Sequence, residues 1–113
     1  MLKKSQRLNL KFSFKPVVAE SKRIETAHFK VFAQKSEQNS FAKVGIALTK
    51  KEFRKAHQRN RARRLTSAAV ETHYLRLIPQ LNLVIMPKAS VTQTEIKELS
   101  NEIGSIAYLY STH

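Results

Sequence analysis

The most constraining feature of the chain is a short apolar run, Leu81–Met86 (LNLVIM), set between Pro79 and Pro87. A run this short and this continuous is typical of a strand that is covered on its faces, so we expect it to be a central strand of a sheet. Even the longer apolar stretch Leu77–Pro87 has only eleven residues. A spanning helix needs roughly 20, so the sequence predicts no membrane partner.

Two segments before this run have strand character. His28–Gln34 (HFKVFAQ) and Phe41–Thr49 (FAKVGIALT) are rich in aromatic and β-branched residues, and a polar, turn-prone stretch separates them. The simplest interpretation is a pair of antiparallel strands joined by a hairpin. The segment Ser5–Lys15 fits both an alternating strand and a helical spacing, so periodicity leaves its structure open.

Two helices are expected. The first runs from Ala56 to Leu77, is stopped by Pro79, and has an apolar stripe formed by Ala62, Leu65, Ala68, Ala69 and Thr72. The second is capped by Ser90 or Thr92 and has apolar residues at three- and four-residue spacing, namely Ile96, Leu99, Ile103, Ile106 and Tyr110. Strands and helices in this order predict an α+β fold in which a small sheet packs against helices in two layers.

The size of the chain suits one domain over residues 1–113, with 42% hydrophobic residues and only 2 glycines and 3 prolines. The absence of cysteine excludes a disulfide framework, a Cys-based zinc site and a thiol nucleophile. It also fits a reducing compartment, and we expect the protein to be cytoplasmic.

The segment Lys50–Arg64 (KKEFRKAHQRNRARR) is strongly basic, with eight Lys or Arg against the single acid Glu52, a local charge of 8 − 1 = +7. The whole chain has 21 Lys and Arg against 8 Asp and Glu, a formal net charge of +13. A cluster this dense repels itself unless a polyanion neutralises it, and displacement of counterions from phosphates gives such clusters affinity for nucleic acids. Nucleic acid is therefore the first partner to consider.

Arginine predominates in the helical part of this segment, and its guanidinium binds phosphate bidentately and stacks on bases. As a bare pattern, such strings also serve as nuclear localisation or heparin-type patches. The residues that we expect to contact RNA are Lys50, Lys51, Arg54, Lys55, His57, Arg59, Asn60, Arg61, Arg63 and Arg64.

The stretch Val44–Leu65 (VGIALTKKEFRKAHQRNRARRL) closely resembles the bacterial ribonuclease P protein subunit. The shared features are a VGI strand that ends in Thr49-Lys50-Lys51, a short basic connection, and the sequence Arg59-Asn60-Arg61 followed by Arg63-Arg64-Leu65. Weaker similarity extends to an aromatic at Phe14, the HFKVF segment and the LNLVIMPKA segment, so the resemblance covers most of the chain.

This resemblance implies a small basic protein that assists a catalytic RNA in removing the 5′ leader from precursor tRNA. The chemistry would belong to the RNA and its bound Mg²⁺, so the protein would have no catalytic residue, no intrinsic cofactor, no metal site and no small-molecule substrate. The resemblance also implies a left-handed βαβ crossover around the basic helix and a leader cleft formed by Phe14, Val18 and Phe32.

Other functions remain open at this point. An intrinsic ribonuclease would need clustered carboxylates, whereas the glutamates are dispersed, the chain has no Asp, and its four histidines lack metal-ligand spacing. Another RNA-binding module, such as a ribosomal protein or an RNA chaperone, would have the same basic surface. An ordinary solvated helix face or a basic helix lying on anionic lipid explains the density of arginine less well.

Overall fold

A mixed sheet forms the base of the molecule in the computed structural model, which describes residues 2–10, 15, 19 and 21–110. Within these residues the strands are β1 (Lys22–Glu25), β2 (Phe29–Lys35), β3 (Lys43–Ile46) and β4 (Leu81–Pro87), in the order β1-β2-β4-β3. The pairs β1–β2 and β2–β4 are antiparallel, whereas β3 and β4 are parallel. The α+β prediction is confirmed.

The apolar run Leu81–Met86 forms most of β4, and its predicted central position in the sheet is confirmed, because β4 has a strand on each side. Leu83 and Ile85 join the main core on the helix side of the sheet, whereas Val84 packs on the opposite face with Leu8. Because both faces of β4 are covered, its side chains are apolar without strict alternation.

The predicted hairpin between residues 28–34 and 41–49 is wrong. β4 lies between β2 and β3, and β2 instead forms its hairpin with β1. The connection after β2 is held to β4, because Asn39 Nδ2 donates to Leu81 O at 3.2 Å and to Asn82 Oδ1 at 2.6 Å. Alternation identifies strands but not their partners, and the mostly charged β1 has too little strand pattern to be recognised.

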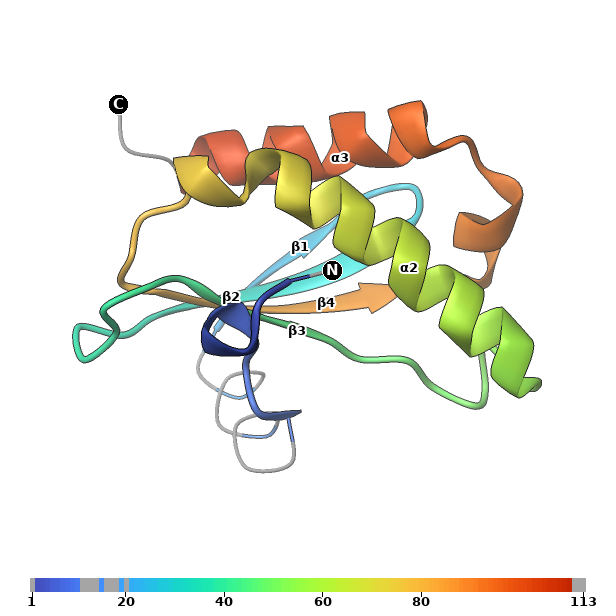
Figure 1. Ribbon diagram of the computed structural model, residues 1–113, viewed down its shortest axis with the longest axis horizontal. Helices are drawn as coiled ribbons and strands as arrows, with labels where there is room; N and C mark the ends of the chain where they lie inside the picture. The colour runs from blue at the N-terminus through green and yellow to red at the C-terminus, as the bar shows by residue number, and fades with distance from the viewer. Residues whose placement is uncertain (1, 11–14, 16–18, 20, 111–113) are drawn as a thin grey trace.

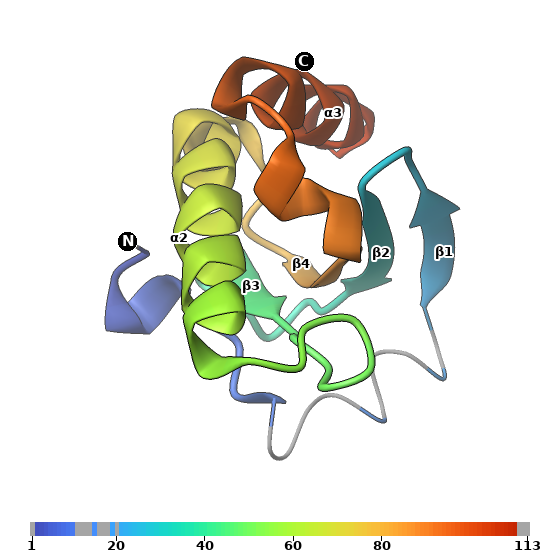
Figure 2. The ribbon, with the colours of Figure 1, turned by 90° about the vertical axis from the view of Figure 1, so that its right-hand side faces the viewer.

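Two long helices, α2 (Ala56–His73) and α3 (Ile96–Leu109), lie side by side on one face of the sheet (Figure 1). Short 3₁₀ turns are η1 (Lys4–Gln6), η2 (Tyr74–Arg76) and η3 (Ala89–Gln93). The chain passes from β3 through α2, which crosses above the sheet, into the parallel strand β4 (Figure 2). The resemblance implied a left-handed β3–α2–β4 crossover, and the two views show it: seen from the helix side with both strands pointing up, β4 lies to the left of β3 (Figures 1 and 2). No helix in the described ranges is both long and apolar enough to cross a bilayer.

The buried face of α2 is rotated from the predicted stripe. Ala62 and Ala69 are buried as expected and Leu65 packs at the edge of the core, but Ala68 and Thr72 are exposed. Thr66, Ser67 and Val70 are buried in their place. Two of these residues are polar, so a stripe defined by hydrophobic residues alone missed them.

In α3, the predicted stripe is confirmed at its centre, where Leu99, Ile103 and Ile106 are buried. Ile96, the first residue of the helix, is however 44% exposed. The predicted caps are also wrong: Ser90 and Thr92 lie within η3, and Glu95 occupies the N-cap position of α3.

Residues 2–10 cover the edge of the sheet at β3. Arg7 forms an isolated parallel bridge with Val44, and Leu8 N donates to Val44 O at 3.1 Å. The side chains of Leu8 and Leu10 pack with Val84 on the sheet face opposite the helices, which we call the second face. Phe14 and Val18, predicted for the leader cleft, lie outside the described residues.

Candidate nucleic-acid interface

The connection between β3 and α2 places the first basic residues on a fixed loop. Phe53 is buried, with only 2% of its surface exposed, and its N–H donates to Thr49 O at 3.0 Å. Glu52 is also held, because its Oε2 accepts a hydrogen bond from Ala89 N at 3.0 Å. The loop is thus anchored at two adjacent residues, while Lys50, Lys51, Arg54 and Lys55 around them are exposed.

The first turn of α2 has no acidic residue, although carboxylates are favoured near a helix N-terminus. Its N-cap residue, Lys55, donates its backbone N–H to Gln58 Oε1 at 3.2 Å. Cations therefore cluster where the helix dipole is itself positive. That arrangement lowers the stability of the helix when no anion is bound, and it raises the local attraction for phosphate.

Arg59 differs from the other arginines of the segment because it is half-buried. Its Nη1 donates to Phe53 O at 2.9 Å and to Arg54 O at 3.1 Å. Arg59 therefore holds the loop against the helix, and its predicted contact with RNA would be made by the rest of the guanidinium.

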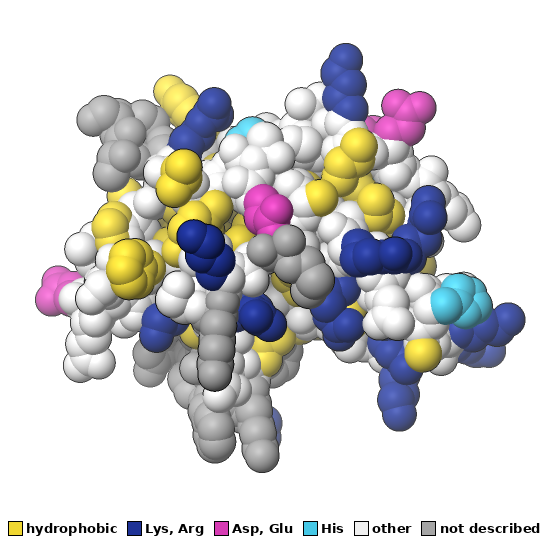
Figure 3. All heavy atoms as spheres, viewed as in Figure 1, with side chains coloured by type: hydrophobic (Ala, Val, Ile, Leu, Met, Phe, Trp, Pro, Cys, Tyr) yellow, Lys and Arg dark blue, Asp and Glu magenta, His cyan; other side chains and the backbone are white. Residues whose placement is uncertain are grey.

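The other predicted contact residues of α2 are exposed, namely His57, Asn60, Arg61, Arg63 and Arg64. Arg61, which lies beside the predicted apolar stripe, points into solvent. Arg63 Nη1 donates to Asn60 Oδ1 at 3.3 Å, which orients both side chains. Lys and Arg side chains gather over the N-terminal half of α2 (Figure 3). Across the described residues, none of the eight cations of Lys50–Arg64 forms an ion pair with a carboxylate.

Two hollows flank the exposed face of α2. One is shallow and open, and His57, Asn60, Arg63 and Arg64 line it. The other has a volume of about 290 Å³ and lies between residues 2–10, β3 and α2. Arg7 and Arg63 both line this second hollow, together with Leu8, Leu10 and Ser67. Arg7 was not predicted, because nothing in the sequence indicates that residues 2–10 lie against β3.

Phe32, the described residue of the predicted leader cleft, lies on the second face of the sheet. It is half-buried and packs with the Leu8 and Val84 cluster. Phe32 pairs with Val84, which pairs in turn with Gly45, so these three residues form a row across the sheet. A Cβ on Gly45 would lie 2.5 Å from Leu10 Cδ2, so any larger residue there would require the Leu10 side chain to shift. The face of β3 at Gly45 is thus covered by Leu10.

A third hollow, of about 160 Å³, continues the second face toward the β3–α2 loop. Lys30, Lys51 and Lys88 line it together with Ala47 and Met86. Lys30 lies two residues from Phe32 in β2 and so projects to the same face of the sheet. Lys30 and Lys88 were missed as candidates, although the alternation Phe29-Lys30-Val31-Phe32 places Lys30 opposite the core residues.

Glu52 is the only acidic residue within Lys50–Arg64, and the ion pairs of the described carboxylates are made outside this segment. Glu25 forms ion pairs of 2.8 Å with both Lys88 and Arg23. Hydrogen bonds from Lys88, and then from Arg23, lower the pKa of the Glu25 carboxyl from 4.5 to about 2. Glu98 and Glu102 lie near His28 instead. The positive field of the basic segment is therefore only weakly offset by the protein's own carboxylates.

Known proteins resemble this chain in sequence and in fold. The family model Ribonuclease P matches residues 2–109. The ribonuclease P protein component of Legionella pneumophila (strain Lens) is 33% identical over 91 residues, which cover 80% of this chain and 76% of that protein. The corresponding protein of Acinetobacter baylyi is 31% identical over 81 residues, which cover 72% of this chain and 60% of the relative.

Solved structures agree on the fold. The RNase P protein of Thermotoga maritima superposes with a TM-score of 0.80 at 17% identity, covering 94% of this chain and 98% of that one. An RNase P protein mutant of Staphylococcus aureus with defective mRNA degradation activity gives a TM-score of 0.81 at 14% identity, covering 94% and 88% of the two chains. The family model spans nearly the whole chain and carries the assignment, which the basic helix and the crossover support. The chain belongs to the ribonuclease P protein family.

Proposed function

We propose that this protein works with a catalytic RNA subunit in the cytoplasm and assists removal of the 5′ leader from precursor tRNA. As a ribonuclease P protein, it is part of a ribonucleoprotein endonuclease that processes tRNA. The observation that carries the proposal is the set of eight cations in Lys50–Arg64 that have no carboxylate partner in the described part of the chain. Phosphates of RNA would supply the missing counter-charge.

In this proposal the exposed arginines of α2 contact the RNA subunit. Arg61 and Arg64 are exposed and can turn toward phosphates, and Arg63 offers the part of its guanidinium that is not bonded to Asn60. Arg59 keeps the β3–α2 loop in place. The two hollows beside α2 admit phosphate or sugar groups between guanidinium side chains. The loop residues Lys50, Lys51, Arg54 and Lys55 extend the same contact surface.

The second face of the sheet is the proposed site for the single-stranded leader. Phe32 offers an aromatic surface for a base, and Phe14 and Val18 belong to the same proposed cleft. Lys30 and Lys51 line the adjoining hollow and would neutralise the leader phosphates. Stacking with support from cations is how proteins hold single strands without reading their sequence.

Hydrolysis is assigned to the RNA partner and the Mg²⁺ that it holds. The basic segment offers Glu52 as its only carboxylate, and that group is already bonded to Ala89 N. The protein would position the substrate and screen the repulsion between the two RNAs, which lowers the requirement for Mg²⁺.

The test is cleavage of precursor tRNA by a bacterial ribonuclease P RNA over a Mg²⁺ titration, with and without this protein. We expect the protein to shift half-maximal cleavage to a lower Mg²⁺ concentration, and protein with Mg²⁺ alone to leave the substrate intact. An unchanged titration would reject the proposal in favour of another RNA-binding module. Cleavage in the protein-only reaction would identify an intrinsic ribonuclease.

A further inference from the structure

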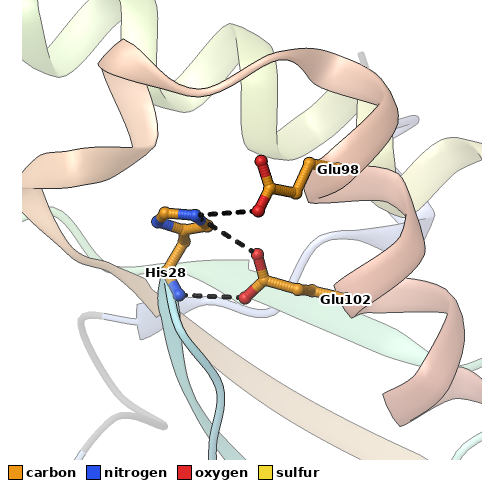
Figure 4. A group of neighbouring side chains, drawn as sticks. All are labelled: His28, Glu98 and Glu102. Atoms are coloured by element: carbon orange, nitrogen blue, oxygen red, sulfur yellow. Dashed lines mark hydrogen bonds and ion pairs between the residues drawn. The ribbon is translucent and has the colours of Figure 1, made fainter.

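A histidine and two glutamates converge where the β1–β2 turn meets α3 (Figure 4). His28 Nε2 lies 3.8 Å from Glu98 Oε1 and 3.6 Å from Glu102 Oε2. One potential ligand atom from each residue lies within 4.8 Å of the others. We expected no metal site from sequence spacing, but His28 and Glu102 are 74 positions apart and meet only through the fold.

The imidazole of His28 is oriented by residues outside this cluster. His28 Nδ1 lies 2.7 Å from Ser90 Oγ in η3, and the His28 side chain is only 16% exposed. His28 Nε2 lies 3.3 Å from Thr94 Oγ1, whose hydroxyl donates to Ser90 O at 2.9 Å. When Nδ1 carries the proton and donates it to Ser90 Oγ, the lone pair of Nε2 is available on the side of the ring where Thr94 Oγ1 and the two carboxylates lie. Histidine ligands of metals commonly have their second ring nitrogen bonded in this way.

The two carboxylate oxygens of Glu102 differ in their surroundings: one accepts a hydrogen bond and the other has no hydrogen-bond donor in the described structure. Its Oε1 accepts the backbone N–H of His28 at 2.9 Å. Its Oε2 is buried and, in the described structure, accepts no hydrogen bond. A buried carboxylate oxygen without a partner is costly, because it has lost its hydration without replacement. A cation beside Oε2 would supply the missing interaction.

In the described part of the chain, Lys and Arg side chains do not supply a cation to Glu102 Oε2. The described ion pairs of Glu98 and Glu102 are with His28 alone, although the chain has 21 Lys and Arg. His28 must be protonated to act as a cation, and it would then contribute a donor rather than a lone pair at Nε2. With neutral His28, the three groups form a nitrogen and oxygen donor set with a charge of −2.

We propose that His28, Glu98 and Glu102 bind one divalent transition-metal ion, with Zn²⁺ as the best match. Bonds of about 2.0–2.2 Å in a tetrahedral zinc site place ligand atoms about 3.3–3.6 Å apart, close to the two Nε2–carboxylate distances. One imidazole with two carboxylates suits Zn²⁺ better than Mg²⁺ or Ca²⁺, which prefer oxygen ligands alone. Glu98 is mostly exposed, so water has access to the fourth position.

The bound ion would join parts of the chain that are distant in sequence. His28 lies in the turn before β2, and both glutamates belong to α3. Because an ion that binds only the folded state stabilises it by mass action, Zn²⁺ would strengthen the attachment of α3 to the edge of the sheet. The site lies outside Lys50–Arg64 and its role does not depend on binding of RNA.

The experiment is a titration of the untagged protein, without RNA, with ZnCl₂, followed by isothermal calorimetry and by thermal unfolding. We expect one saturable site per chain and a midpoint of unfolding that rises with Zn²⁺. Glu98→Gln is the central variant, because Glu98 is exposed and its substitution leaves the buried contacts of His28 intact. It should weaken binding by about tenfold or more.

Glu95→Gln and His57→Gln are matched controls, since both residues are exposed and lie outside the cluster. Their zinc affinity should equal that of the original protein. The NMR signals of the His28 imidazole should shift on addition of Zn²⁺, with the largest change at Nε2. Absence of saturable binding, or equal binding by Glu98→Gln and the controls, would overturn the proposal and leave an ordinary contact between histidine and carboxylate.

Discussion

Arg59 Nη1 donates a 2.9 Å hydrogen bond to the carbonyl oxygen of Phe53, the buried anchor of the loop before α2. The same nitrogen bonds to Arg54 O. One arginine of the basic segment thus has a structural role, while its neighbours Arg61 and Arg64 are exposed. The stability of the protein and its affinity for RNA should therefore respond differently to substitution within one short sequence.

Replacing Arg59 with Ala should lower the free energy of unfolding by about 1 kcal/mol, because two carbonyl groups lose a charged donor. Replacing Arg61 with Ala should change it by less than about 0.5 kcal/mol, as is usual for exposed positions. Urea denaturation followed by circular dichroism measures both values. Equal effects of the two substitutions would show that Arg59 does not hold the loop.

Replacing both Arg61 and Arg64 with Ala should weaken binding to the RNA subunit and flatten its salt dependence. Each lost phosphate contact should reduce the slope of log K against log salt concentration by about 1. Binding measured by filter retention at several salt concentrations gives the slope. Arg76→Ala is the matched control, since Arg76 is exposed in η2 beyond the far end of α2, and an equal loss of slope there would refute a localised interface.

Replacing Phe32 with Leu should selectively weaken binding of precursor tRNA. The aliphatic side chain can still pack with Leu8 and Val84 but loses base stacking, which is worth about 1–3 kcal/mol per base. Affinities of the reconstituted ribonucleoprotein for precursor and mature tRNA provide the measurement. Phe41→Leu should change neither affinity, because Phe41 is 59% exposed in the loop after β2. Equal weakening for both RNAs would assign Phe32 to packing alone.

Acid should destabilise the protein partly through Glu25. The folded-state pKa of its carboxyl is lowered from 4.5 to about 2, so its ion pairs stabilise the fold above pH 4.5. That contribution is lost as pH falls toward about 2, since protonation then occurs in the folded state as well. Unfolding by urea between pH 6 and pH 2 should thus show a shallower loss of stability in Glu25→Gln. Glu37→Gln, an exposed control, should follow the original curve.

Replacing Thr66 with Val should raise the free energy of unfolding by about 1 kcal/mol. Thr66 is fully buried in α2, and its hydroxyl forms no hydrogen bond in the described structure. Valine has nearly the same shape and removes the unsatisfied group. Thr72→Val is the comparison, because the exposed Thr72 hydroxyl donates to Ala68 O at 3.1 Å. A loss of stability in Thr66→Val would show that the Thr66 hydroxyl has a partner in solution.

Local sequence patterns predicted which segments form strands and helices better than they predicted which strands pair with one another. The run Leu81–Met86 was correctly placed in the centre of the sheet, because a strand with apolar side chains on both faces must be buried on both faces. The pairing of β2 with β4 joins residues such as Phe29 and Pro87, and no local feature indicates it. The position of Arg7 beside β3 depends on the same long-range packing.

The candidate interface was predictable to the extent that it is continuous in sequence. Arg61, Arg63 and Arg64 could be chosen because one helix holds them together. Alternation indicates the face of Lys30 but not its neighbourhood with Lys88, since the hollow that they share exists only after β2 and β4 are paired. The convergence of His28 with Glu98 and Glu102 has the same origin, and spacing along the chain excluded it from consideration.

The bridge between Arg7 and Val44 has a consequence for self-association. Strand β3 ends the sheet on one side, and its outer backbone groups would be free to pair with a second molecule without the hydrogen bond from Leu8 N to Val44 O. The opposite edge, β1, is protected by the exposed charges of Lys22, Arg23 and Glu25. Residues 2–10 thus occupy the edge of β3 and protect it from pairing with a strand of another molecule. Their removal would favour oligomers formed by strand addition at β3.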